Sequence, residues 1–547
     1  MRDLRRLVSA APRMLAVTLV TVVTLAATSV DTWSAERRPA TPRAAPAAAR
    51  HALPCDDMKA LRIPHVKVKD TQSVPAGTYS PPGGGETFPD LPAFCRVTAT
   101  ITHVPGSSVS MELWLPSEEW NGRYMQVGTH GFGGVVHREE MAPQLRRGFA
   151  TAATDSGHTA PAGLFDSSWA FESRQRITDY AWRSVHETAS TAEGLVGSFY
   201  GQRAAYSYYV GSSTGGRDGM TSAQKFPHDF DGILAGNAIQ NFTRGGTQML
   251  TTSRRLSQAG FNGEEGAKLL ELVRNEAIAA CDDEDGVTDG ILRDPRSCDW
   301  NPRGLVCHAG QEKGTCLSAR QAEAVEAVTS PLRDPVTKQR IYVGQDISSQ
   351  FDWIDLLPTS AFSDALYQMA LNDPDWDGSS FDLHTDFAAV EDKLGFVNAT
   401  NPDLRAFKAA GGKIIQYQNL EDGVVSPQST TEYYDAALRE TAHGDRSELG
   451  SFYRLFMVPG RSHKGLGSGP DNFGQDVAPP VARDAEHDAV TALVDWTEKG
   501  RAPEHLIASQ SASDGDITMQ RPLCPYPKKA VYKGVGNPDV ASNFVCD

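Results

Sequence analysis

The sequence lacks several patterns that mark whole classes of protein. No two of its eight cysteines have C-x-x-C spacing, so a zinc site is not expected. Basic residues are fewer than acidic ones, with 52 Lys and Arg against 68 Asp and Glu, which gives a formal net charge of −16. Because such a chain repels phosphate backbones, nucleic acid is not expected as a partner. The sequence also shows no internal repeat.

Long apolar runs are missing beyond the N-terminus. Met14–Val30 is apolar and uncharged and follows a basic start, which predicts a secretory signal peptide over residues 1–35. The alternative is a single membrane anchor, because the run is close to the lower limit of roughly 17 residues for a spanning helix. A Pro/Ala-rich stretch predicts a disordered spacer over 36–54. We therefore expect a secreted chain with no membrane contact after signal cleavage.

The eight cysteines all lie beyond the predicted signal peptide. Their even number and the expected export favour disulfides. Spacing alone cannot choose among roughly a hundred possible pairings. Local pairing is the simplest hypothesis and joins Cys55 with Cys95, Cys281 with Cys298, Cys307 with Cys316, and Cys524 with Cys546.

Secondary-structure patterns predict an α/β fold with one large interruption. A predicted strand at 205–210 leads through a Gly-rich turn and a helix-compatible run to a second strand at 230–235. This order is typical of a parallel βαβ unit. Strands and helices alternate again near the C-terminus, whereas the middle of the chain holds four cysteines and an acidic loop. We therefore expect an α/β core, 55–236 and 406–547, with a lid insertion at 237–405.

The turn after the first of these strands carries the clearest catalytic pattern. Gly211-Ser212-Ser213-Thr214-Gly215 fits G-x-S-x-G, in which a strained strand-to-helix turn exposes the central serine hydroxyl. A Ser/Gly loop can match this motif by chance. The predicted strand before it and helix after it meet the context that the motif requires, so Ser213 is the candidate nucleophile of an α/β hydrolase.

A serine nucleophile needs a base and an orienting acid, which follow it in α/β hydrolases in the order acid, histidine. A predicted strand at 413–417 leads to Glu421 and Asp422, and one at 454–458 leads to His463. Alone, the acids would be interpreted as a solvated turn and the histidine as a surface residue. Their order and their places at strand ends favour a catalytic set.

Four segments together resemble the tannase and feruloyl esterase family, which also includes bacterial mono(2-hydroxyethyl) terephthalate hydrolase. They are GSSTGGRDGMTSAQKFPHDFDGILAG at 211–236, CDDEDGVTDGILRDP at 281–295, EDGVVSPQSTTEYY at 421–434 and RLFMVPGRSHKGLGSGP at 454–470. The resemblance covers most of the chain from Cys55 to Cys546. It implies an α/β-hydrolase fold with Ser213 as nucleophile, Asp422 as orienting acid and His463 as general base.

The chain departs from this family beside both the serine and the histidine. Family members usually have a disulfide between these two flanking positions, whereas this sequence has Ser212 and Lys464. The resemblance implies that the eight cysteines form the family's four other bridges, in agreement with local pairing. We expect positions 212 and 464 to face each other, with Cα atoms roughly 4.4–6.8 Å apart.

Fixed N–H donors must meet the negative charge that develops on a carbonyl oxygen. The backbone of Thr214, next after the nucleophile, is one predicted donor. The Gly-rich loop after the strand that ends at Val127 is the predicted source of the second donor, from His130 or Gly131. A plain glycine turn is the alternative interpretation of this loop.

An acidic loop in the insertion suggests a metal site. Residues 281–292 lack both end ligands of an EF-hand, and the charges alone favour a solvated loop. The family resemblance instead implies a structural Ca²⁺. Its implied ligands are the side chains of Asp282, Asp285 and Asp289 and the carbonyls of Val287 and Ile291.

Together these patterns predict a secreted serine carboxylic-ester hydrolase that forms an acyl-enzyme on Ser213. The resemblance implies a small-molecule aromatic ester as substrate, with a ferulate-like or gallate-like acyl group. Five aromatic residues of the insertion are stacking candidates, although most are expected in its own core: Phe351, Trp353, Phe362, Tyr367 and Trp376. The alternatives are an acyltransferase or hydrolase of a specialised natural-product ester, a non-catalytic secreted binding protein, and a serine peptidase.

Overall fold

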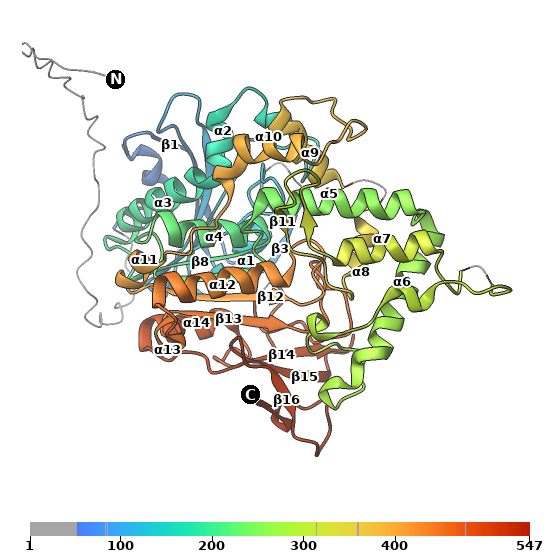
Figure 1. Ribbon diagram of the computed structural model, residues 1–547. Helices are drawn as coiled ribbons and strands as arrows, with labels where there is room; N and C mark the ends of the chain where they lie inside the picture. The colour runs from blue at the N-terminus through green and yellow to red at the C-terminus, as the bar shows by residue number, and fades with distance from the viewer. Residues whose placement is uncertain (1–51, 83, 85, 313, 358–359, 476) are drawn as a thin grey trace, which may run out of the picture. The chain divides into compact units, whose positions relative to one another are not determined.

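The described part of the chain pairs nine strands into one mixed sheet (Figure 1). In spatial order the strands are β1 (Val66–Val74), β4 (Phe94–Ile101), β5 (Val109–Pro116), β7 (Ala150–Thr154), β6 (Arg123–Val127), β8 (Tyr206–Ser212), β9 (Gly232–Gly236), β12 (Lys413–Asn419) and β13 (Tyr453–Val458). Neighbours are antiparallel from β1 to β7 and parallel from β7 to β13. Because parallel strands end at one edge of a sheet, the loops after β6, β8, β12 and β13 meet there.

The computed structural model describes residues 52–547 except positions 83, 85, 313, 358, 359 and 476. The predicted signal peptide and the spacer up to residue 51 lie outside the described residues. Within the described ranges, no helix combines the length and the apolar character needed to cross a membrane.

Alternating side chains of the sheet enter two different cores. In β8, Tyr209 packs into one hydrophobic cluster, while Tyr208 and Val210 pack into the other. The first core is covered by α3 (Ser184–Tyr200), α4 (Thr214–Lys225) and α12 (Pro427–Ala442), and the second by α1 (Arg138–Arg146) and α14 (Ala489–Lys499). β8, α4 and β9 form the predicted parallel βαβ unit, and the predicted α/β fold is confirmed.

Residues 237–405, here called the lid segment, leave the sheet after β9 and return at β12, which pairs directly with β9. The segment contains α5 (Phe242–Ala259), α6 (Gly263–Cys281), α7 (Ala319–Thr329), β10 (Leu332–Arg333), β11 (Arg340–Tyr342), α8 (Gln350–Asp355), α9 (Ala361–Leu371) and α10 (Thr385–Leu394), and α11 (Arg405–Ala409) begins at its last residue. One of its cores includes Phe132 from the loop after β6 and Val425 from the loop after β12. The lid segment is therefore packed onto the edge where the strand-end loops meet.

All eight cysteines form four disulfides, and these are the pairs that local pairing predicts. They are Cys55–Cys95, Cys281–Cys298, Cys307–Cys316 and Cys524–Cys546. Two bridges lie inside the lid segment, one lies in the first part of the described chain, and one lies in its last part.

The remaining strands and α-helices are β2 (Gly77–Tyr79), β3 (Phe88–Leu91), α2 (Arg174–Thr178), α13 (Arg446–Gly450), β14 (Leu506–Ser511), β15 (Ile517–Leu523), β16 (Ala530–Tyr532) and β17 (Phe544–Cys546).

A buried carboxylate in β5 anchors the start of α1, which follows the loop carrying His130 and Gly131. Glu112 accepts two hydrogen bonds from Arg96, at 2.8 and 2.9 Å, and two from Arg138, at 3.1 and 2.9 Å. Burial alone would raise the pKa of Glu112, but the two guanidinium groups outweigh it and hold that pKa below the ordinary value of 4.5.

Glu112→Gln should lower the free energy of unfolding by about 3 kcal/mol at pH 7, because buried Arg96 loses its buried carboxylate partner and keeps only the exposed Asp70, 3.7 Å away. A depressed folded-state pKa stabilises the fold above the unfolded pKa of 4.5, and this contribution disappears as pH falls through the folded pKa. In urea unfolding, the difference in free energy of unfolding between the wild type and Glu112→Gln should therefore be smaller at pH 3 than at pH 7. Glu326→Gln, which removes the ion-pair partner of the exposed Arg303, is the control and should leave stability nearly unchanged. An equal difference at both pH values would contradict the prediction.

Candidate active site

Ser213 lies on the turn between β8 and α4, at the edge where the parallel strands end. Its φ of 59° and ψ of −121° give a non-glycine residue a strained conformation. A Cβ on Gly211 would lie 2.8 Å from the carbonyl carbon of Gly215, and one on Gly215 would lie 2.7 Å from the Thr129 carbonyl oxygen. The turn therefore needs the small residues that the G-x-S-x-G motif supplies.

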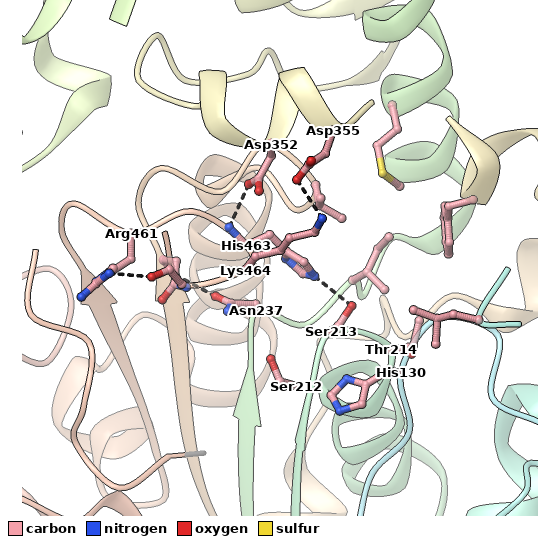
Figure 2. A pocket seen from close by; sticks show the side chains of 18 of the residues that line it. His130, Ser212, Ser213, Thr214, Asn237, Asp352, Asp355, Arg461, His463 and Lys464 are labelled. Carbon is pink, nitrogen blue, oxygen red and sulfur yellow. Dashed lines mark hydrogen bonds and ion pairs between the residues drawn. The ribbon is translucent and has the colours of Figure 1, made fainter. Parts of the chain in front are cut away.

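Two hydrogen bonds join Ser213, His463 and Asp422 in one row. Nε2 of His463 lies 3.0 Å from Oγ of Ser213, as Figure 2 shows, and Nδ1 lies 2.8 Å from Oδ2 of Asp422. The other oxygen of Asp422 accepts the backbone N–H of Val424 at 2.8 Å and of Val425 at 2.7 Å. The loop after β12 thus fixes the carboxylate that orients the imidazole. The structure brings together the three residues that the sequence predicts.

The surroundings of His463 favour its charged form. Burial lowers the pKa of His463, but the charge of Asp422 and its hydrogen bond raise it, so the net pKa lies above the ordinary value of 6.5. With Nδ1–H donated to Asp422, neutral His463 presents the lone pair of Nε2 to the Ser213 hydroxyl. The arrangement can take a proton from Ser213 and stabilise the imidazolium that results.

Ser213 and His463 line a cavity of about 560 Å³. Small-molecule sites have volumes of roughly 300–1,000 Å³. Phe165 and Phe362 form an aromatic wall, with their ring centroids 5.9 Å apart. Arg461 also lines the cavity, in an ion pair of 3.1 Å with Asp471, and Figure 2 shows it on the opposite side of His463 from Thr214. The cavity can therefore hold a ligand with an apolar ring and a polar group.

The predicted oxyanion-hole residues line the same cavity: Thr214, His130 and Gly131. The loop after β6 touches the turn at Ser213, since the Thr214 hydroxyl lies 3.4 Å from the Thr129 carbonyl oxygen. Gly131 has a φ of 53°, and a Cβ on it would lie 2.6 Å from the Leu164 side chain. The backbone N–H groups of Thr214 and of His130 or Gly131 stay the predicted donors.

One of the five predicted stacking candidates, Phe362, lines the cavity. Three others are buried in the hydrophobic cores of the lid segment: Trp353, Tyr367 and Trp376. The Phe351 ring lies 4.5 Å from the guanidinium of Arg274. Phe165 also lines the cavity and was missed, because it comes from a loop before the lid segment and no motif marks it.

Ser212 and Lys464, the positions without the expected disulfide, both line the cavity. Nζ of Lys464 lies 2.8 Å from Oδ2 of Asp355 on α8, and Figure 2 shows this side chain directed toward that helix. The histidine loop is therefore joined to the lid segment on this side. A Cα separation within disulfide reach stays a prediction.

Asp352 of α8 is a second residue that the sequence analysis missed. Asp352 is 1% exposed, and its carboxylate accepts the backbone N–H groups of His463 and Gly423. Burial and the charge of Asp422 raise the pKa of Asp352 to about 6. A single aspartate in the lid segment has no motif around it, so the sequence offers no signal for its role.

The acidic loop of the lid segment brings its carboxylates close together without forming an ion cage. Burial raises the pKa of Asp285, and the charges of Asp289 and Asp282 raise it further. Asp289 is paired with Arg521, while Asp282 accepts the N–H groups of residues 289, 290 and 291. Over the described ranges, no group of three or more His, Cys, Asp or Glu side chains is placed to hold a metal ion. Asp282 and Asp289 are thus engaged by protein donors in this arrangement, and calcium binding stays a prediction.

Comparisons with known proteins agree with this geometry. The family model described as tannase and feruloyl esterase matches residues 95–547. An uncharacterized esterase of Xanthomonas campestris pv. campestris is 34% identical over 533 residues, which cover 90% of this chain and 91% of that protein. The probable feruloyl esterase B-2 of Aspergillus terreus is 31% identical over 492 residues, covering 87% of this chain and 92% of that protein.

A solved structure shows the same fold. The crystal structure of feruloyl esterase B from Aspergillus oryzae superimposes with a TM-score of 0.83 at 30% sequence identity, over 90% of this chain and 99% of that one. The sheet and its helices accordingly form an α/β-hydrolase core. The chain belongs to the tannase and feruloyl esterase family of carboxylic ester hydrolases.

Proposed function

We propose that the protein is a secreted serine esterase that hydrolyses esters of hydroxylated aromatic acids through an acyl-enzyme on Ser213. The observation that carries this proposal is the hydrogen-bonded row of Ser213, His463 and Asp422 beside a cavity with an aromatic wall. Names of similar proteins, which include feruloyl esterases, support the aromatic acyl class. The side chains of Phe165 and Phe362 would contact the acyl ring.

The proposed reaction has two halves that share one base. Oγ of Ser213 attacks the ester carbonyl carbon while Nε2 of His463 takes the hydroxyl proton, and His463 then gives this proton to the leaving alcohol oxygen. Water next attacks the acyl carbonyl carbon while Nε2 of His463 takes a proton from it. The bond to Oγ of Ser213 then breaks, His463 returns the proton to Oγ, and the free acid leaves. Asp422 keeps the ring in the required tautomer and stabilises the imidazolium.

Backbone donors would stabilise the tetrahedral intermediates. Thr214 is the first residue of α4, and the N-terminus of a helix favours negative charge near its N–H groups. A second N–H would come from His130 or Gly131 in the loop that contacts the turn. Each such donor is worth roughly 10²–10³-fold in rate in enzymes of this chemistry.

The alternatives predict different products. An acyltransferase or a hydrolase of a specialised natural-product ester would use the same serine. An added alcohol would be the main acyl acceptor in the transferase, whereas water would be the main acceptor in the hydrolase. A non-catalytic binding protein would cleave no ester, although the intact row of three residues argues against it. A serine peptidase would cleave an amide faster than the matching ester.

Export is part of the proposal. The N-terminal sequence predicts a signal peptide, and four disulfides suit an oxidising compartment. Structural Ca²⁺ at the loop of Asp282, Asp285 and Asp289 is also proposed, from the family resemblance alone, and no catalytic step depends on it.

Ser213→Ala should abolish ester cleavage, lowering kcat/KM by about 10⁵-fold or more. The panel is methyl ferulate, methyl gallate, a terephthalate monoester and p-nitrophenyl acetate. Ser222→Ala is the matched control, because that serine lies on α4 and its hydroxyl bonds to the Asp218 carbonyl, so activity should persist. Activity of the wild type on an aromatic ester supports the acyl class. Activity that survives in Ser213→Ala would refute the nucleophile.

The kcat/KM of the wild type should rise with pH through one ionisation above 6.5, because His463 must be neutral to act as a base and its pKa is raised. Asp422→Asn removes the main charge that raises this pKa and should move the ionisation to lower pH. It should also reduce kcat by roughly 10³–10⁴-fold through loss of the correct tautomer. An unchanged acid limb in Asp422→Asn would contradict this assignment, and pH–rate profiles with p-nitrophenyl acetate measure it.

Dialysis against chelator should lower the melting temperature by at least about 2 °C, and excess CaCl₂ should restore it, since an ion bound only to the folded state stabilises that state. Asp285→Asn should abolish the response to CaCl₂. Differential scanning fluorimetry measures both effects. A melting temperature that chelator leaves unchanged would rule out structural calcium.

A further inference from the structure

One carboxylate oxygen of the lid segment joins the loop of Asp422 to the loop of His463. Oδ2 of Asp352 on α8 accepts the backbone N–H of His463 at 2.8 Å and that of Gly423 at 2.8 Å. Figure 2 shows Asp352 directed at the backbone of His463, on the opposite side of the residue from Ser213. Gly423 directly follows Asp422 in the chain. Both donors therefore lie within one residue of the Asp422–His463 hydrogen bond.

α8 packs directly against Gly423 in the loop of Asp422. A Cβ on Gly423 would lie 2.9 Å from Cβ of Asp352, 3.0 Å from the Ser349 carbonyl oxygen and 3.1 Å from the Trp353 ring. The Asp352 carboxylate is itself buried. Because hydrogen bonds to a charged acceptor are strong and shielded from water here, this contact fixes the spacing of the two loops.

No covalent bond ties the histidine loop to the nucleophile strand at these positions, since residues 212 and 464 are serine and lysine. Lys464 instead reaches the same helix α8, through its ion pair with Asp355. The side chains of this pair are 60% and 44% exposed, and exposed pairs change an equilibrium by no more than about fivefold. Of these two links between α8 and the histidine loop, the contact of Asp352 is the buried one.

We infer that Asp352 is a positioning residue, which holds the imidazole of His463 between Ser213 and Asp422 through the backbone of both loops. This inference rests on the proposed function of the same site. Asp352 touches no reacting atom, and its effect passes through His463 and Gly423. An N–H contact that holds a reacting group in line is worth up to about 10²-fold in rate when its loss shifts that group by about 1 Å.

The charge of Asp352 has a second, separable effect. Three charged groups face His463: Asp422 beside its ring, Asp352 at its backbone and Lys464 next in the chain. Burial has the largest effect and lowers the pKa of His463. The charges of Asp422 and Asp352 raise this pKa, and the charge of Lys464 lowers it. Asparagine at 352 keeps an oxygen acceptor but removes the charge, whereas alanine removes both.

The test compares Asp352→Ala and Asp352→Asn with the wild type on methyl ferulate and p-nitrophenyl acetate. Asp352→Ala should lower kcat about 10- to 100-fold with KM changed less than about threefold. Asp352→Asn should keep kcat within about tenfold and move the acid limb of kcat/KM to lower pH. If Asp352→Ala does not fold, the acid limb of Asp352→Asn decides.

Asp445→Ala is the matched control, because this carboxylate also accepts two backbone N–H groups, at the start of α13 and away from the site. It should lower the melting temperature without changing kcat or the acid limb. An acid limb that stays in place in Asp352→Asn, or a kcat within twofold of wild type in folded Asp352→Ala, would overturn the inference. Failure of the proposed function is distinct: the wild type would then cleave neither ester, or Ser213→Ala would stay active.

Discussion

The parallel pairing of β8, β9, β12 and β13 is the constraint on which the site depends. Ser212 pairs with Gly236, and Gly236 pairs with Tyr417, so the serine turn and the acid loop leave the sheet at one edge. Asn419 and Val458, the last residues of β12 and β13, pair with each other, so the histidine loop leaves the sheet beside the acid loop. Because a slip of one residue would reverse every side chain of a strand, the two buried cores hold this register and, with it, the three loops.

The strained turn persists because its backbone is fully engaged. The N–H of Ser213 donates to the Gly236 carbonyl at 2.9 Å, and its carbonyl accepts from Arg217 at 3.0 Å and Ile239 at 3.3 Å. A strained residue costs about 1–3 kcal/mol, which neighbouring structure must offset. Here the pairing partners belong to β9, α4 and the start of the lid segment, so the serine is held from three sides.

Buried carboxyl groups lie in the lid segment, at Asp346, and in the adjoining acid loop, at Glu421. Burial raises the pKa of Asp346 and of Glu421 to about 7, with Arg296 and Arg274 acting against this rise. Both acidic residues are buried, so this part of the structure beside the acid loop is shielded from water. In that region a hydrogen bond such as that of Asp352 to His463 is stronger than it would be in water, and a missing partner would cost more. The polar interior of the lid segment is thus coupled to the geometry of His463.

The sequence by itself determined the features that depend on neighbouring residues. The turn at Ser213 and the strand ends that lead to Asp422 and His463 follow from local geometry. The spacing of the cysteines made local pairing the simplest hypothesis, and the structure decided it. Only the tertiary structure decided which distant side chains support them. Asp352 lies 111 residues from His463, and Arg521 lies 232 residues from Asp289. Such contacts follow from how the whole lid segment packs on the sheet, and a single sequence has no periodicity or spacing that records this packing.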